Sequence, residues 1–73
     1  MERYFVTTKH PTGWQDGTHT FECKQDIGSG GWYAVAEGFG CSKTYATADR
    51  AIRAMCADHA CVVTALVEIG GQS

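Results

Sequence analysis

A chain of 73 residues is about half the length of a typical domain, so we predict one domain spanning residues 1–73. A domain this small buries only ~60% of the surface that its unfolded chain exposes, which leaves little room for a deep active site beside the core. Eight acidic and six basic side chains are scattered and give a net charge of −2, so the chain lacks the cationic cluster that nucleic-acid binders need, and we expect no direct nucleic-acid binding.

The N-terminal segment carries no apolar stretch behind a basic start, so it does not read as a secretory signal. The longest apolar stretch, residues 62–69, is far shorter than a membrane span. We therefore expect a cytoplasmic protein without membrane contact.

The first half of the chain predicts two strands and a long connection. Residues 3–8 are β-branched and aromatic and indicate the first strand. Residues 9–18 hold the only proline and two glycines, which is typical of a loop. Residues 19–25 alternate, with Phe21 and Cys23 on one face and polar side chains on the other, so this second strand has one face in water.

A glycine-rich turn over residues 26–31 precedes a third strand at 32–37. Residues 38–46 connect this strand to the only clear helix. The helix is predicted to begin at Thr47, because the Thr47 hydroxyl can cap the backbone N–H groups of the first turn. Spacing of three and four residues defines the stripe predicted to face the core: Ala48, Ala51, Ile52, Met55 and His59.

Residues 61–69 predict a fourth strand, and residues 70–73 a frayed tail. The order β-β-β-α-β indicates an α+β fold: an antiparallel meander and a fourth strand, with the helix packed on one sheet face. A right-handed crossover from the third strand through the helix would place the fourth strand beside the first and parallel to it. The second sheet face should remain partly open.

No residue pattern indicates catalysis, a metal or a cofactor. Among the four cysteines only Cys56 and Cys61 lie close together, which does not provide the two ligand pairs of a structural zinc site. We expect reduced thiols that fill core gaps, without disulfides. The three histidines have unremarkable contexts, and at His59 capping of the helix end is favoured over catalysis. We therefore expect a protein that is not an enzyme.

Four aromatic residues are the candidates for binding a partner protein. Trp14 lies in the polar loop, Trp32 and Tyr33 are adjacent in one strand and so point to opposite faces, and Tyr45 precedes the helix. Tryptophan and tyrosine are enriched in interface hot spots. Two interpretations of Trp14 stay open: it folds back over the edge of the core, or it forms a binding or dimer face with Tyr45 and one of Trp32 or Tyr33.

The layout resembles that of small phage-encoded anti-CRISPR proteins, which combine a short antiparallel sheet with one helix. The resemblance rests on the strand at residues 3–8, the segment 45–54 and the closing strand 62–69. It covers the whole chain, but no functional residue can be transferred, because that group shares no motif. It implies a protein of the host bacterial cytoplasm that binds a CRISPR effector subunit and blocks target DNA recognition or cleavage.

A second resemblance, to the N-terminal domain of HicB-type antitoxins, covers about half the chain: a Gly-aromatic strand at residues 31–35, Gly40-Cys41, and a Thr-led helix start at 47–51. Phe39 stands where that family has proline, and the DNA-binding domain that often follows is absent. This resemblance implies binding of a small ribonuclease toxin. We prefer the anti-CRISPR interpretation because it requires no second domain. A structural homodimer, paired through the open sheet face or a strand edge, is the third hypothesis.

Overall fold

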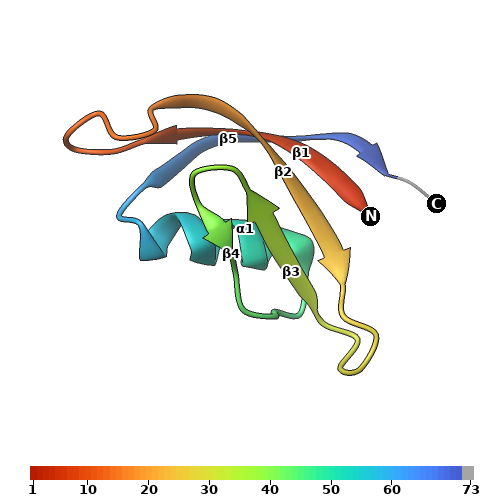
Figure 1. Cartoon of the computed structure of the whole chain (residues 1–73). Coiled ribbons are helices and arrows are strands. Elements are labelled where there is room, and N and C mark those ends of the chain that lie inside the picture. Colours follow the sequence, from red (N-terminus) through yellow and green to blue (C-terminus); the bar gives the residue numbers. More distant parts are fainter. Residues whose placement is uncertain (72–73) are drawn as a thin grey trace.

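A computed structural model describes residues 1–71 as one antiparallel sheet and one helix. The strands lie in the order β4-β3-β2-β1-β5, with the helix beneath them (Figure 1). The elements are β1 (Glu2–Lys9), β2 (Gly17–Gln25), β3 (Trp32–Ala36), β4 (Gly40–Cys41), α1 (Ala48–Asp58) and β5 (Val62–Gly71). The predicted α+β class, with the helix on one sheet face, is confirmed.

Alternation along the strands decides which side chains enter the core. In β1, Tyr4, Val6 and Thr8 are buried, whereas Arg3, Phe5 and Lys9, at the alternate positions, are exposed. The same period buries Phe21 and Cys23 in β2, as the sequence predicts. The buried side chains all point to the face on which the helix lies, so the core is one layer between sheet and helix.

The two-residue strand β4 was not expected, and it changes the direction of the last strand. A turn at Gly38 (φ +87°) folds the chain back so that β4 pairs antiparallel with the end of β3. The chain then returns to the start of β3, where Trp32 and Tyr45 exchange two backbone hydrogen bonds of 2.7 Å. The helix therefore starts at the opposite end of β3 from the one that the crossover argument assumed.

This extra reversal makes β5 antiparallel to β1, with Lys9 opposite Val62 and Phe5 opposite Val67. The prediction of a parallel fourth strand was wrong because it counted no reversal between the third strand and the helix. The predicted position beside β1 is correct. The strand also continues to Gly71, where a tail beginning at residue 70 was predicted, and residues 72–73 lie outside the described residues.

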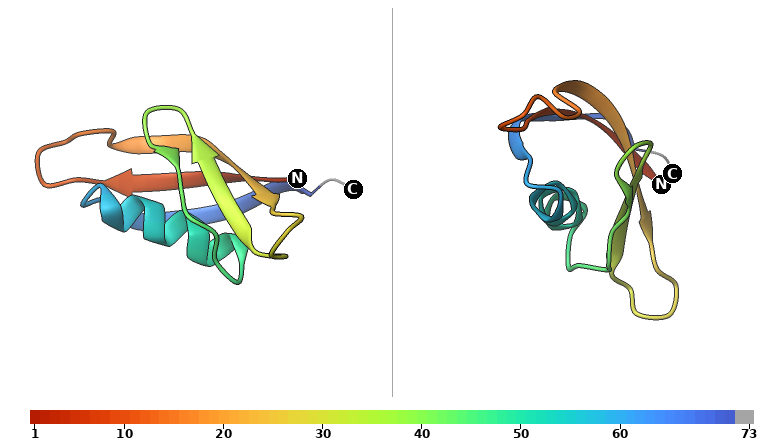
Figure 2. Two further views of the ribbon diagram at one scale, coloured as in Figure 1. Left: turned by 60° about the horizontal axis from the view of Figure 1, so that its bottom comes forward. Right: turned by 60° about the vertical axis from the view of Figure 1, so that its left-hand side comes forward.

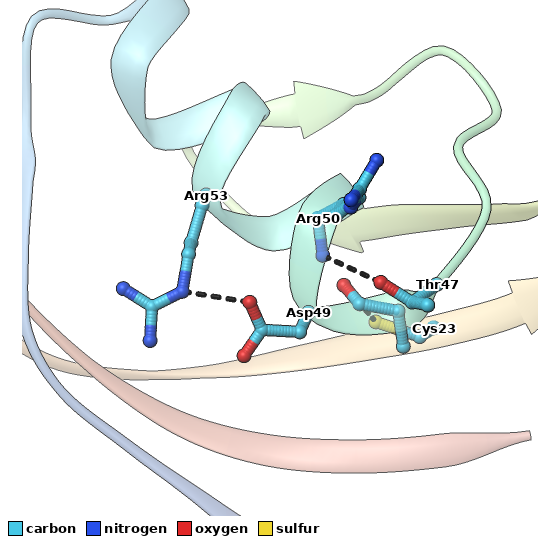
Figure 3. A network of polar contacts seen from close by, with 6 residues as sticks. Cys23, Thr47, Asp49, Arg50 and Arg53 are labelled. Atoms are coloured by element: carbon cyan, nitrogen blue, oxygen red, sulfur yellow. Dashed lines mark hydrogen bonds and ion pairs between the residues drawn. The ribbon is translucent and has the colours of Figure 1, made fainter.

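The helix begins where its sequence predicts. The Thr47 hydroxyl accepts a hydrogen bond of 3.2 Å from the backbone N–H of Arg50, and the Arg53 side chain donates to Asp49 over 2.7 Å (Figure 3). On the sheet side, the Cys23 thiol points to the carbonyl of Ala48 at 4.0 Å. Cap and ion pair thus lie on the exposed surface of the helix, away from the core.

The buried face of the helix consists of Ala48, Ala51, Ile52, Met55 and Cys56. His59, expected on this stripe, is only half-buried because it follows the helix as its C-terminal cap. Figure 2 shows the helix on the concave side of the curved sheet, where it packs against β2, β3 and β5. Within residues 1–71, no helix has the length and apolar character needed to cross a membrane.

An alanine in the left-handed conformation closes the helix. Ala60 has φ +61°, the N–H of Cys61 donates to the carbonyl of Cys56 (2.8 Å), and the N–H of Ala60 donates to that of Ala57 (2.9 Å). These two bonds form a Schellman motif, in which glycine is the usual left-handed residue because it carries no Cβ.

Replacing Ala60 with glycine should therefore raise the free energy of unfolding by up to ~1 kcal/mol, because it removes the steric penalty of a left-handed alanine. Urea unfolding measures the change. The control is Ala57→Gly, at an exposed position with ordinary helical geometry, which should lower stability by ~0.5–1 kcal/mol. Equal losses for both variants would contradict the assigned cap.

A substitution at Met55 tests which face of the helix packs on the sheet. Its side chain is only 2% exposed within the core, so Met55→Ala should destabilise the protein by ~2–5 kcal/mol through lost burial and a residual cavity. Ala57→Ser, on the exposed side of the same helix, is the matched control and should change stability by less than ~0.5 kcal/mol. A loss below ~1 kcal/mol for Met55→Ala would show that another helix face packs on the sheet.

Candidate functional site

Hydrogen bonds connect the loop between β1 and β2 to the strands that carry it. The backbone N–H of His10 donates to the Asp16 carboxylate (2.7 Å), which closes the base of the loop. The carbonyl of Gln15 accepts from the Thr8 hydroxyl (2.7 Å) and from Nε2 of His19 (2.6 Å). These contacts fix both ends of the loop to the strands that carry it, so the side chain between them, Trp14, starts from a fixed backbone.

Three rings surround Trp14. Its indole stacks on His59, with centroids 5.2 Å apart and planes at 23°, and meets Phe39 and His10 edge-on at 5.4 and 5.9 Å. Offset-stacked and edge-to-face geometries are the favourable arrangements for aromatic rings. Even so, 38% of Trp14 remains exposed. The indole thus packs on these rings with one part of its surface and leaves another part open to solvent.

Phe39 is the residue on which this arrangement depends. It lies in the β3–β4 turn, is only 4% exposed, and touches the rings of Phe21 and His19 in addition to Trp14 and His59. Its carbonyl accepts a hydrogen bond of 2.8 Å from Nε2 of His59. Phe39 therefore links the core to the surface group that we call the Trp14 cluster: His10, Trp14, His19, Phe39 and His59.

Gly38 allows the two loops to meet. The Gln15 side chain lies directly over Gly38, in the space that a Cβ atom would occupy, and Gly38 has a positive φ of +87°. Any side chain at position 38 would displace Gln15 and strain the turn. The β1–β2 loop and the β3–β4 turn are consequently packed together.

All three histidines of the chain belong to this cluster, although each had an unremarkable sequence context. His19 and His59 donate from Nε2 to carbonyl oxygens, while Nδ1 of His10 accepts from the N–H of Thr12 at 3.0 Å. These bonds use the imidazoles as structural donors and acceptors. Within residues 1–71 no group of three histidine, cysteine or acidic side chains is placed to hold a metal ion.

An open hollow of about 650 Å³ adjoins the cluster. It is present because β3 pairs with β2 only from Glu22 to Gln25, which leaves the preceding part of β2 without a neighbour on that side. Neutral polar groups dominate its wall, and Glu37 supplies the one carboxylate there. The lining residues are Gln15, Thr18, His19, Thr20, Glu37 and Gly38.

The structure separates the four aromatic residues that the sequence singles out. Trp32 and Tyr45 are half-buried and pack against the core at the start of β3. Tyr33 lies opposite Lys24 on the open sheet face. Trp14 packs against Phe39 beyond the other end of β3, a strand that extends over ~13 Å from Trp32 to Ala36. No face combines Trp14 with the other three residues.

The indole folds back over the edge of the core, as the first interpretation of Trp14 has it, and still exposes more than a third of its surface. The face with Tyr45 and one of Trp32 or Tyr33, which the second interpretation requires, is not formed. The residues that sequence reasoning missed are Phe39 and the histidines. They come from the β1–β2 loop, the start of β2, the β3–β4 turn and the helix end, and no local spacing connects these segments.

The cysteines take no part in this surface. Cys23 and Cys56 are fully buried, and burial raises the pKa of their thiols from the ordinary 9.0 to about 12 and about 11. Burial also raises the pKa of Cys61. Thiols held in the protonated form are weak nucleophiles, so these three side chains act as small apolar core residues.

Comparison of the chain with models of protein families, with curated proteins and with solved structures found no match.

The buried thiols predict a loss of stability at alkaline pH. Above pH 9 the unfolded chain releases these protons while the folded chain keeps them, so the free energy of unfolding should fall as the pH rises from 9 towards about 11 for Cys56 and about 12 for Cys23. Urea unfolding from neutral pH upwards measures this fall. Cys23→Ala should reduce its steepness, and a flat profile above pH 9 would contradict the account.

Proposed function

We propose that this protein acts without catalysis, by binding another protein through the Trp14 cluster. The observation that carries the proposal is that Trp14 packs against three rings and remains 38% exposed. A tryptophan that is already ordered loses little conformational entropy when a partner covers it, and tryptophans dominate interface hot spots. A loop that served only to connect two strands would not need this support.

The hollow beside the cluster supports the same proposal. Its hydroxyl, amide and imidazole groups offer hydrogen bonds, and Glu37 is an exposed carboxylate at its wall. This composition suits a lysine or arginine side chain of a partner that also covers the indole. Binding would then combine one apolar contact, at Trp14, with one charged contact, at Glu37.

The partner we propose is a subunit of a CRISPR effector complex, with inhibition of target DNA recognition or cleavage as the result. Support comes from the resemblance in layout to small anti-CRISPR proteins, together with a preformed binding surface on a single small domain. Inhibition by occupation of a surface requires a rigid contact and no reacting group, which is what the Trp14 cluster offers.

The test is a target-DNA cleavage assay with purified effector complexes of several types, with and without this protein. Wild-type protein should inhibit at least one type when present in stoichiometric amount. Trp14→Ala and Glu37→Lys should each weaken inhibition by about tenfold or more. Ile27→Ala, which truncates an exposed aliphatic side chain in the distant β2–β3 turn, is the control and should inhibit like the wild type.

Circular dichroism has to show that the variants are folded, because Trp14 also contacts Phe39 and its loss should lower stability by ~1–2 kcal/mol. Glu37 is exposed and has no packing role, so its variant keeps the test valid even if Trp14→Ala unfolds. Full inhibition by both variants, or no inhibition of any effector by the wild type, would overturn the proposal.

A further inference from the structure

Exposed apolar side chains gather at one side of the sheet. Of the seven large apolar residues that are more than a third exposed in the described chain, two lie in loops, Trp14 and Ile27. The other five lie on β1 or β5 or directly precede β1: Met1, Phe5, Val62, Val67 and Ile69. Because β5 is the last strand of the sheet, this apolar side coincides with an unpaired edge.

The edge is long, and its centre is regular. β5 has ten residues, whereas β4 at the opposite edge has two. Shifts in the β1–β5 register leave Thr64 and Ile69 without partners on β1 and bound a regular stretch, Ala65 to Glu68. Within this stretch Val67 lies on the open face opposite Phe5, while Leu66 faces the helix opposite Val6.

The two ends of the β1–β5 strand pair carry different charged groups. Lys9 lies at the end where β5 begins, opposite Val62. Glu2 and Glu68 lie at the end where β5 finishes. Arg3 is at this second end too, but its side chain is directed to Glu22 on β2, at 3.5 Å. The first end therefore carries a lysine, with Asp16 in the adjoining loop, and the second end carries two glutamates beside the N-terminal amino group.

We propose that a second copy of this chain pairs with β5 in antiparallel orientation, about a two-fold axis at Leu66, so that two sheets join into one. In this register Ala65 faces Val67 of the second copy, and Val67 faces its Ala65. On the open face the row formed by Phe5 and Val67 then continues onto the second copy, which covers apolar surface that one chain leaves bare. The end of each copy that carries Glu68 then lies beside the end of the other copy that carries Lys9, which a parallel arrangement would not achieve.

The same features stop the assembly at two copies. Pairing about a two-fold axis uses the β5 edge of both chains and leaves only the β4 edges free. β4 is two residues long, and beyond it the edge of β3 is occupied at Trp32 by the bridge to Tyr45. Short edges of this kind do not support the addition of further strands.

The dimer would carry its two Trp14 clusters at opposite ends of the joined sheet. The Trp14 loop follows Lys9, at the end of β1 where β5 begins. An antiparallel partner presents its own loop at the far end, so neither loop is covered by the dimer contact. Self-association thus goes beyond the proposed function and makes the protein a carrier of two identical binding surfaces.

Sedimentation equilibrium over a range of protein concentrations tests the proposal. The wild type should have twice the 7.9 kDa mass of the chain. Val67→Lys places a charge at the contact and should weaken association by about tenfold or more. Ile27→Lys makes the same kind of change at a fully exposed position far from β5 and should remain dimeric. A wild type that stays monomeric, or a Val67→Lys variant that dimerises like Ile27→Lys, would overturn the proposal.

Disulfide trapping tests the register. In a Cys41→Ser background, which removes the exposed thiol, Leu66→Cys should form an intermolecular disulfide on oxidation, because residues opposite each other in antiparallel strands lie within disulfide range. Val62→Cys would face residue 70 of the second copy and should not cross-link. Cross-linking of Val62→Cys alone would overturn the proposed register. If Val67→Lys is monomeric and still binds the proposed effector through Trp14, effector binding does not depend on the dimer contact, and the two proposals can be tested separately.

Discussion

One helix has to cover a five-stranded sheet, and it is too small to do so. Eleven helical residues extend over only ~16 Å, whereas the ten residues of β5 extend over ~33 Å. The helix lies on the concave face, where Phe21, Ile52 and Val6 fill the centre of the core. The part of the sheet that the helix does not reach is covered by loops or stays exposed. The two surfaces to which we assign a role, the Trp14 cluster and the β5 edge, both lie in this part.

At the end of the sheet near the helix C-terminus, loops close the core instead of a second helix. Phe39 enters from the β3–β4 turn and Trp14 from the β1–β2 loop, and His59 connects them to the end of the helix. The covering layer is therefore aromatic, and its outermost ring is only partly buried. A binding site at this place needs no deep cavity, in agreement with the small size of the domain.

The sequence predicted what depends on a repeating pattern. β-Branched and aromatic composition located β1, alternation located β2, and the three-and-four spacing with Thr47 located the helix and its buried face. It did not predict β4, because two residues have no period, and this omission reversed the predicted direction of β5. Trp14 was recognised as a candidate because no packing pattern explained it, but its neighbours Phe39 and His59 are brought to it only by the tertiary fold.

The central claim is that the side of the sheet beyond the helix is completed by association with another chain. Amide hydrogen exchange measured as a function of protein concentration tests it most directly, because strand pairing protects amides that an unpaired edge exposes to water. We predict that exchange in residues 65–68 slows as concentration rises, while exchange in the turn over residues 26–31 stays constant. Exchange in β5 that does not depend on concentration would contradict the account.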